Sequence, residues 1–501
     1  MEIDEESCYR AVRSRDQRFD GWFFVGVTST GIFCRPSCPA TTPRRANVRF
    51  FPSAAAAQTA GFRACRRCRP DTAPGSPAWN VAGDLARRAT ALIDDGVVDR
   101  EGVGGVARRL AVSERHLHRV LTAELGASPV ALARSRRAQT ARVLIETTDL
   151  PVTEIAFASG FASVRQFNDT VRAFFAASPT ELRAGRSTAI RRGRAGASPA
   201  SMADAGGPTP VSLRLAARRP FAGTELLAFL GARAIAGSEV VGADGGYHRT
   251  LRLPSGPGIV SLHAEADHVR ARLLLADLAD LAPAVARCRR LLDLDADPVA
   301  VDAALGADPL LAPLVAAVAG RRSPGAVDGA EQLVRAVIGQ QVSVSGARTV
   351  AARLVAAVGD PLPPSLVAAP GVPPGLDATF PTAGAVADAP DDALAMPVAR
   401  RRALAQACGL AASGTLSLDA GAPRDEVGAR LAEVPGIGPW TTAYVALRAL
   451  GDPDVFLPTD LGVRRGLAAR GGPDDPAEIG EQAAAWRPWR SYALHHLWAA
   501  A

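Results

Sequence analysis

The chain of 501 residues contains no lysine, so all 57 of its basic side chains are arginine. Chemistry that needs a lysine amine, such as a Schiff base between the protein and a carbonyl carbon, is therefore excluded. Long apolar runs are also absent, because charged residues or prolines interrupt every stretch of 18 residues, and the chain starts with the acidic string MEIDEES. We therefore expect a cytoplasmic protein without a membrane partner.

Acidic residues are in short supply only in the first part of the chain. Residues 1–200 carry 30 basic and 19 acidic side chains, whereas residues 201–501 carry 27 and 31. This excess of positive charge favours binding of a polyanion by the first part, although a basic segment that is merely solvated would give the same count. With 48% hydrophobic residues, the chain is long enough to form several domains, each with its own core.

Proline, glycine and serine are enriched in three segments, 71–77, 184–210 and a loop around 358–374, of which the first two are predicted to be linkers. Short amphipathic helices are predicted between residues 79 and 183, and Ala/Leu-rich helices toward the C-terminus. Alternating apolar and β-branched residues predict strands at 24–28, 31–33, 48–50, 211–215, 247–253 and 259–264.

Seven cysteines occur, an odd number, and we expect free thiols rather than disulfides. Four of them form two close pairs, Cys34-x3-Cys38 and Cys65-x2-Cys68. Such spacings let four thiolates surround one tetrahedral zinc ion at Zn–S distances of about 2.3 Å. The pattern predicts zinc, but a purely structural zinc site is the more common use of four cysteines, so spacing alone leaves that alternative open.

The residues around these cysteines carry more information than the spacing. The strings TSTGIFCRPSCPA (28–40), NVRFF (47–51) and AGFRACRRCRPD (60–71) resemble the N-terminal domain of the Ada family, over about residues 5–75. The resemblance implies that Cys34 accepts a methyl group from a methylphosphotriester in DNA, with Cys38, Cys65 and Cys68 as the other zinc ligands. Methylation would remove one negative charge from an arginine-rich surface, and we expect it to tighten binding to DNA phosphates.

Two segments have the pattern of a helix-turn-helix. Residues 103–121 place apolar side chains at helical spacing on both sides of a turn at Ser113, and residues 153–174 repeat the arrangement. An ordinary helical bundle would fit one such pattern. Two of them, joined by a helix predicted at 130–145, resemble the AraC-type DNA-binding domain, and the string at 151–182 is the diagnostic part. The second helix of each motif is expected to meet the major groove through His118, Arg119, Arg165 and Gln166.

The C-terminal part contains the string LAEVPGIGPWTTAYVALRAL (431–450), which predicts a helix, a hairpin and a second helix that opens at a proline. Gly436 and Gly438 permit the tight hairpin, and the exposed amides at the start of the second helix can hold a DNA phosphate. Asp460 follows an apolar segment, VFLPT. Spacing alone favours a helix N-cap for this aspartate over a catalytic role.

These strings, together with EQLVRAVIGQQVS (331–343), FPT (380–382) and WRPWRSYALHHLW (486–498), resemble the AlkA branch of the helix-hairpin-helix glycosylases over about 290 residues. The resemblance implies that Asp460 stabilises an oxocarbenium-like sugar after the nucleotide has been flipped out of the duplex. Trp440, Tyr444 and Trp498 would form the walls of the base pocket, although an aromatic stripe is more often core than pocket. Gln341 stands where AlkA inserts a leucine into the vacated base stack, and Thr459 replaces an acidic residue.

The chain is thus predicted to be a multidomain α+β protein. A small zinc α/β domain, an all-α AraC-type double helix-turn-helix, a small AlkA-type α+β domain and an all-α helix-hairpin-helix glycosylase domain would follow one another. Their predicted ranges, with a linker before the third domain, are 1–77, 78–185, 186–210, 211–285 and 286–501.

The resemblances together imply a DNA alkylation-repair protein. It would release alkylated purines as a DNA-3-methyladenine glycosylase II, transfer methyl groups from DNA phosphotriesters to Cys34 stoichiometrically, and regulate transcription after methylation. Lyases of this superfamily use a lysine amine, so no lyase activity is expected. We further expect one zinc ion, no iron-sulfur cluster, double-stranded alkylated and promoter DNA as partners, and a monomer. The alternative is a transcription regulator whose glycosylase half only binds lesions.

Overall fold

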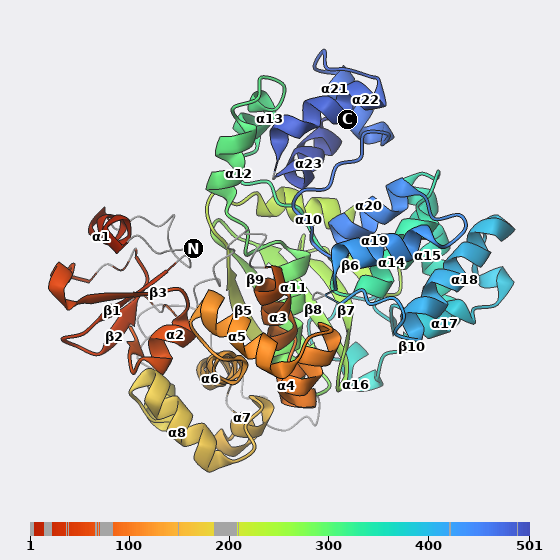
Figure 1. Cartoon of the computed structure of the whole chain (residues 1–501). Coiled ribbons are helices and arrows are strands. Elements are labelled where there is room, and N and C mark those ends of the chain that lie inside the picture. The colour runs from red at the N-terminus through yellow and green to blue at the C-terminus, as the bar shows by residue number, and fades with distance from the viewer. Residues whose placement is uncertain are drawn as a thin grey trace. The chain divides into compact units, whose positions relative to one another are not determined.

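A computed structural model gives the fold of the chain, and its helices and strands are labelled in Figure 1. The structure describes residues 5–14, 23–36, 38, 40–65, 68, 70, 84–148, 150–184, 208, 210–419, 422–487 and 489–501. The predicted linker at 71–77, and all of the linker at 184–210 except Ala184, Pro208 and Pro210, lie outside the described residues. The chain forms two compact units, the first being residues 1–213 with 253–256 and 274–286.

A four-stranded sheet of order β3-β1-β2-β4 forms the N-terminal domain of the first unit. β1 pairs antiparallel with β2 and β3, whereas β2 pairs in parallel with β4. Phenylalanines from several strands fill its core, among them the fully buried Phe33. Three strands were predicted to within one residue at each end, and β4 was not predicted. The elements are α1 (Glu5–Ser14), β1 (Phe24–Val27), β2 (Ile32–Cys34), η2 (Arg45–Asn47), β3 (Val48–Phe51), α2 (Ala54–Thr59) and β4 (Arg63–Ala64).

Helices alone form the next part of the first unit. Ser113 and Ser163 each accept a hydrogen bond from a backbone amide and so cap the second helix of each predicted helix-turn-helix. Buried leucine, valine and alanine side chains, with Ile93, pack α3, α4, α5 and α6 into one core. The helices are α3 (Asp84–Asp94), α4 (Val97–Arg109), α5 (Glu114–Leu125), α6 (Pro129–Thr147), α7 (Val152–Ala158) and α8 (Val164–Phe175).

A five-stranded sheet of order β5-β9-β8-β7-β6 follows in the chain. β7 is buried along almost its whole length and β8 over its middle, as expected for strands covered on both faces. The strands predicted at 211–215, 247–253 and 259–264 are present, and β6 and β9 were not predicted. The elements are β5 (Val211–Ala216), α10 (Gly223–Gly231), β6 (Glu239–Val241), β7 (Tyr247–Leu253), β8 (Gly256–Ala264), β9 (His268–Leu275), η5 (Leu278–Asp280) and α11 (Leu281–Leu291).

The remaining part of the second unit is helical apart from a two-stranded sheet of β10 (Asp360–Pro361) and β11 (Ala378–Thr379). Thus the segment 358–374, predicted as a loop, contains a short strand and α16 (Pro364–Val367). The helices are α12 (Pro298–Leu305), α13 (Ala312–Ala317), α14 (Gly329–Ile338), α15 (Val344–Val358), α17 (Ala383–Ala387), η6 (Asp391–Ala393), α18 (Val398–Ala412), α19 (Arg424–Ala432), α20 (Pro439–Arg448), α21 (Leu461–Ala468), α22 (Pro476–Ala483), η7 (Ala484–Trp486) and α23 (Arg490–Ala500).

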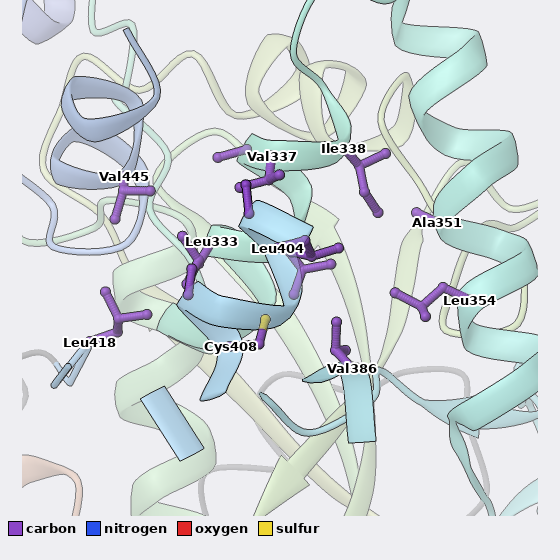
Figure 2. Close-up of a cluster of buried hydrophobic side chains, with 14 of the residues drawn as sticks. Leu333, Val337, Ile338, Ala351, Leu354, Val386, Leu404, Cys408, Leu418 and Val445 are labelled. Carbon is purple, nitrogen blue, oxygen red and sulfur yellow. The ribbon is translucent and has the colours of Figure 1, made fainter. Parts of the chain in front are cut away.

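The core of this helical part is centred on α14, whose side chains Leu333, Val337 and Ile338 are buried. Figure 2 shows these residues with Leu404 and Cys408 of α18 and other buried side chains of the same cluster. Close packing of this kind leaves little freedom to the ends of the helices involved. The C-terminal end of α14 and the N-terminal end of α20 are thereby held beside each other, and both border the cleft described below.

The described helices include none that combines the length and the apolar character needed to cross a bilayer.

Candidate functional sites

The irregular segment 449–460 between α20 and α21, the strap, positions Asp460. Val455 and Leu457 on this strap are buried in an apolar cluster with residues of α21 and α23. The carboxylate of Asp454 receives two hydrogen bonds from Arg490, of 2.7 and 2.9 Å, and so ties the strap to the start of α23. The packing of the strap therefore fixes the position of Asp460 at the start of α21.

Asp460 is the N-cap of α21, as its spacing favoured. Its Oδ1 accepts hydrogen bonds from the amides of Gly462, at 2.9 Å, and Val463, at 3.1 Å. The carboxylate also receives the indole N–H groups of two tryptophans, Trp498 on Oδ1 at 2.8 Å and Trp440 on Oδ2 at 3.1 Å. Four donors hold this carboxylate, two of which belong to aromatic side chains that capping does not require.

Aromatic side chains surround this carboxylate in a cleft of about 1330 Å³. The rings of Trp440 and Tyr444, one helical turn apart on α20, are stacked with centroids 5.0 Å apart and an interplanar angle of 11°. Trp498 of α23 is tilted by 51° against Tyr444 at 6.2 Å. The structure thus brings together in one cleft the four residues that the sequence analysis assigned to the base site.

Phe229, which the sequence analysis missed, supports the aromatic wall from α10. Its ring stacks against Trp498 with centroids 6.5 Å apart and an interplanar angle of 15°. The guanidinium carbon of Arg233 lies 3.7 Å from the centre of the Phe229 ring, a cation-π contact. Phe229 precedes Trp498 by more than 260 residues, so no local pattern could have connected the two.

The inner wall of the cleft is a buried network of ion pairs. Arg249 of β7 bonds to Glu239 at 3.0 Å and to Glu331 of α14 at 2.7 Å, and Arg335 pairs with the same two glutamates. Burial raises the pKa of Glu239, but Arg335 and Arg249 outweigh this effect and lower the pKa to about 2. All four charges are paired, so the network joins the sheet to α14 without leaving a free charge among them.

Gly462 leaves room for Trp498 to reach Asp460. A Cβ atom at this position would lie 2.8 Å from Trp498 Cδ1 and 3.2 Å from Asp460 Oδ1. We expect Gly462→Ala to displace the indole, to lower stability by about 1–2 kcal/mol through overpacking, and to slow base release more than tenfold. Thermal unfolding and base-release assays check this. Gly480→Ala on α22 is the control, because a Cβ atom there would meet no other part of the chain within 4 Å, and this variant should keep full activity. Equal losses in both variants would contradict the steric argument.

The hairpin between α19 and α20 carries the predicted phosphate-binding amides. Gly436 has φ +91°, which only glycine adopts readily, and Gly438 is the N-cap of α20 without any capping side chain. Both glycines are exposed and border the cleft. The start of α20 therefore has an exposed N-cap without a capping side chain, as a helix end that binds a DNA phosphate through its amides requires.

Gln341 lines the same cleft as this hairpin and lies in the turn after α14. It is exposed and has φ +56°, a left-handed conformation that glutamine seldom adopts. The neighbouring Gln340 donates to Gly436 O at 3.1 Å and to Thr441 Oγ1 at 2.8 Å, and so fixes the turn to the hairpin. Strained exposed residues of this kind cluster at binding sites.

The four paired cysteines meet at one edge of the N-terminal sheet. Because β2 and β4 are parallel neighbours, Cys34 at the end of β2 and Cys65 directly after β4 reach the same edge. The sulfur atoms of Cys34, Cys38, Cys65 and Cys68 all lie within 4.8 Å of one another. Tetrahedral zinc places its sulfurs about 3.8 Å apart, so the cluster fits this ion.

Thiol chemistry agrees with this fit. Hydrogen bonding between Cys34 and Cys38 raises the pKa of Cys34 and lowers the pKa of Cys38, so thiol groups this close share protons. A dication allows all four to be thiolates. Cys65 and Cys68 are buried, whereas Cys34 and Cys38 are partly exposed.

The helix-turn-helix residues lie at the surface. His118 and Arg119 on α5 and Arg165 and Gln166 on α8 are all exposed, as contact with a major groove requires. Arg119 bonds to His116 Nδ1 at 2.8 Å.

Comparisons with known proteins agree with this arrangement. The metal-binding domain of Ada matches residues 7–71, a helix-turn-helix domain matches 106–185, and the AlkA N-terminal domain matches 212–328. A protein of Mycobacterium tuberculosis H37Rv, described as "Probable bifunctional transcriptional activator/DNA repair enzyme AlkA", is 51% identical over 498 residues, which cover 99% of this chain and 97% of that protein.

The C-terminal half has further relatives. DNA-3-methyladenine glycosylase 2 of Escherichia coli is 38% identical over 285 residues, covering 56% of this chain and 94% of that protein. The solved structure of a 3-methyladenine DNA glycosylase from Archaeoglobus fulgidus has a TM-score of 0.50 and 21% identity, covers 57% of this chain and 97% of that chain, and shows the shared fold. The predicted fold class and the resemblances to Ada and AlkA are thus confirmed, and the chain belongs to the family of bifunctional Ada/AlkA transcriptional activators and DNA repair enzymes.

Proposed function

We propose that this chain repairs alkylated DNA in two ways, as a DNA-3-methyladenine glycosylase without lyase activity and as an acceptor of methyl groups from DNA phosphotriesters at Cys34. The observation that carries the first activity is the Asp460 carboxylate held by two tryptophan indoles inside an aromatic cleft. The test is incubation with methylated DNA, with free purine and methylated cysteine measured in the same sample.

Base release begins with a flipped nucleotide in the cleft. The bond between sugar C1′ and the base nitrogen breaks with its electron pair going to the base, and the sugar becomes an oxocarbenium-like cation. Asp460 stabilises this cation with its negative charge. Water then attacks C1′ and loses its proton toward the carboxylate, which leaves an abasic sugar.

The aromatic walls suit a positively charged base. An alkylated purine such as 3-methyladenine carries a positive charge that already weakens its glycosidic bond, so holding the ring matters more than protonating it. The faces of Trp440 and Tyr444 present the electron-rich side of their rings, to which cations are attracted. Since the chain has no lysine, no lysine amine can attack C1′ and cleave the strand afterwards.

Methyl transfer uses a separate site. Zinc, when bound by Cys34, Cys38, Cys65 and Cys68, keeps the sulfurs as thiolates, the nucleophilic form. Cys34 Sγ attacks the methyl carbon of a methylphosphotriester, the C–O bond breaks with its electron pair going to the phosphate oxygen, and a thioether and a phosphodiester anion remain. No step regenerates the thiolate, so each chain accepts one methyl group.

Methylation also supplies a switch for transcription. Loss of one thiolate charge reduces the repulsion between the protein and DNA phosphates. The affinity for a promoter, which the exposed helices α5 and α8 contact, then increases. We propose that the protein acts on double-stranded DNA as a cytoplasmic monomer that holds one zinc ion in this site and no iron-sulfur cluster. Equal promoter affinity of methylated and unmethylated protein would contradict the switch.

Gln341 fills the space left in the base stack when a nucleotide is flipped out of a duplex. We expect Gln341→Gly to lower purine release from double-stranded DNA about tenfold and to leave release from single-stranded DNA unchanged, because single strands have no stack to refill. The free energy of unfolding should change by less than about 1 kcal/mol. Glycine relieves the strain of the left-handed conformation, and this gain offsets the extra conformational freedom that it gives to the unfolded chain. Parallel assays on both substrates measure this ratio.

The control for this prediction is Ala176→Gly, because Ala176 also has a left-handed conformation, with φ +53°, but lies on the helix-turn-helix part. It should alter neither rate. A uniform loss on both substrates in Gln341→Gly would show that Gln341 supports the cleft rather than the stack.

A further inference from the structure

A second group of metal-ligating side chains lies on the five-stranded sheet, apart from the four cysteines. Asp244 is in the turn between β6 and β7, His248 is on β7, and His263 is on the neighbouring strand β8. One ligand atom from each of these three residues lies within 4.8 Å of the others. None of the three lines the aromatic cleft, and neither proposed reaction uses them.

The distances within this group suit a common cation. Asp244 Oδ1 is 3.2 Å from His248 Nε2, and Asp244 Oδ2 is 2.8 Å from His263 Nε2. Ligands that surround a tetrahedral zinc ion at about 2.0–2.1 Å lie about 3.3 Å from each other. Both distances lie near the spacing of zinc ligands, so one ion between the carboxylate and the two Nε2 atoms fits the dimensions of the group.

Other contacts hold the ligands in place. His248 is buried, and its Nδ1 is bonded to Ser261 Oγ at 2.8 Å, which leaves Nε2 directed to the group. The amide of Gly246 donates to Asp244 Oδ1 at 3.0 Å and fixes the carboxylate. Metal-binding histidines commonly have such a partner on the second ring nitrogen, because it sets the tautomer and the direction of the free nitrogen.

Two glycines keep the space around the ligand atoms open. A Cβ atom at Gly242 would lie 2.6 Å from His248 Nε2 and 2.4 Å from Asp244 Oδ1. A Cβ atom at Gly246 would lie 2.5 Å from His263 Nε2 and 2.9 Å from His248 Nε2. Any other residue at these positions would occupy the place where the three ligand atoms meet.

We propose that Asp244, His248 and His263 bind one divalent transition-metal ion, with zinc as the ion best suited to two imidazoles and one carboxylate. Imidazole ligands favour zinc, copper, nickel and iron over magnesium and calcium, which prefer oxygen ligands. The Asp244 side chain is 54% exposed, so an ion can enter from solvent and can keep water at its remaining positions. The bound ion would join the turn at 242–246 to β8.

The experiment measures metal binding by the full-length protein. After incubation with zinc and dialysis, the wild-type chain should retain two zinc ions, one in the cysteine site and one here, whereas His263→Gln should retain one. His268→Gln is the matched control, because His268 is a histidine on the adjacent strand β9 that bonds to Asp267 and lies outside the group. This control should retain two ions.

A second readout separates the two sites. In cobalt-loaded protein, the cysteine site gives strong sulfur-to-metal charge-transfer bands, and the new site should add weak visible bands without them, which His263→Gln should remove. Added zinc should raise the melting temperature of the wild type more than that of the variant. If His263→Gln misfolds, Asp244→Asn in the exposed turn tests the same point. Retention of the second ion by both variants, or one ion in the wild type, would overturn the proposal.

Discussion

Asp460→Asn should slow purine release strongly and leave the protein folded. A carboxylate about 4 Å from the developing positive charge, at an effective dielectric constant of about 20, contributes about 4 kcal/mol. Loss of that charge should slow base release by about 10³-fold. Free 3-methyladenine released from methylated DNA under single-turnover conditions is the quantity to measure.

The fold should tolerate this change because asparagine caps helices about as well as aspartate does. Its oxygen can still accept from the amides of Gly462 and Val463 and from the Trp498 indole, and only the bond from Trp440 is lost. One neutral hydrogen bond contributes about 1 kcal/mol, so melting should shift little.

Asp475→Asn is the matched control. Asp475 caps α22 in the same way, through bonds from the amides of Ala477 and Glu478, but it does not line the cleft. This variant should release purine at the wild-type rate. Full purine release by Asp460→Asn would contradict the catalytic assignment. If instead the wild type binds alkylated duplex but releases no base, the alternative that this half only binds lesions would be favoured.

Asp460 also shows what the sequence could and could not predict. The apolar strap and the N-cap follow from local pattern, and both are present. Spacing favoured the N-cap over catalysis, yet the structure places the cap inside an aromatic cleft, so the two roles are compatible. The observation that supports a catalytic role beside the cap is a pair of indole donors, 20 and 38 residues away, whose approach depends on tertiary packing.

Other sites in the chain show the same difference between features set by local sequence and contacts set by tertiary packing. The cysteine site was predictable because two of its spacings are short, while the strand β4 that brings the pairs together has two residues and leaves no periodic signal. Phe229 could not be predicted because its contact with Trp498 joins distant segments. The group on β7 and β8 spans only residues 244–263, but His263 meets the other two residues through the pairing of the two strands, which no local pattern shows. The local sequence does not distinguish Gly462 from an ordinary helical residue, because its role depends on how close Trp498 lies to the position of its missing Cβ atom.

Cys34→Ser should remove all methyl transfer and leave base release intact. Serine offers an alcohol instead of a thiolate and is a far weaker nucleophile at neutral pH. The wild-type chain should gain one methyl group after incubation with DNA that carries methylphosphotriesters, and the variant none. Because the two reactions use separate residues, purine release by Cys34→Ser should match that of the wild type.

The position of the methyl group is as informative as its presence. Cys38 is also partly exposed, so it is the rival acceptor. Trypsin leaves both cysteines on one peptide, since Pro36 follows Arg35, and fragment ions must therefore assign the methyl group. A methyl group on Cys38, or methyl gain that survives in Cys34→Ser, would contradict the assignment of Cys34.

Zinc removal provides the remaining comparison. Cys38→Ser removes a ligand without touching the proposed acceptor, and a chelator removes the ion from the wild type. Both treatments should stop methyl transfer because a cysteine sulfur that is no longer bound to the dication returns toward the protonated thiol, which is a poor nucleophile. If methyl transfer to Cys34 continued at the full rate without metal, the role of zinc would be purely structural. Another group than the zinc-cysteine cluster would then have to keep Cys34 in its thiolate form.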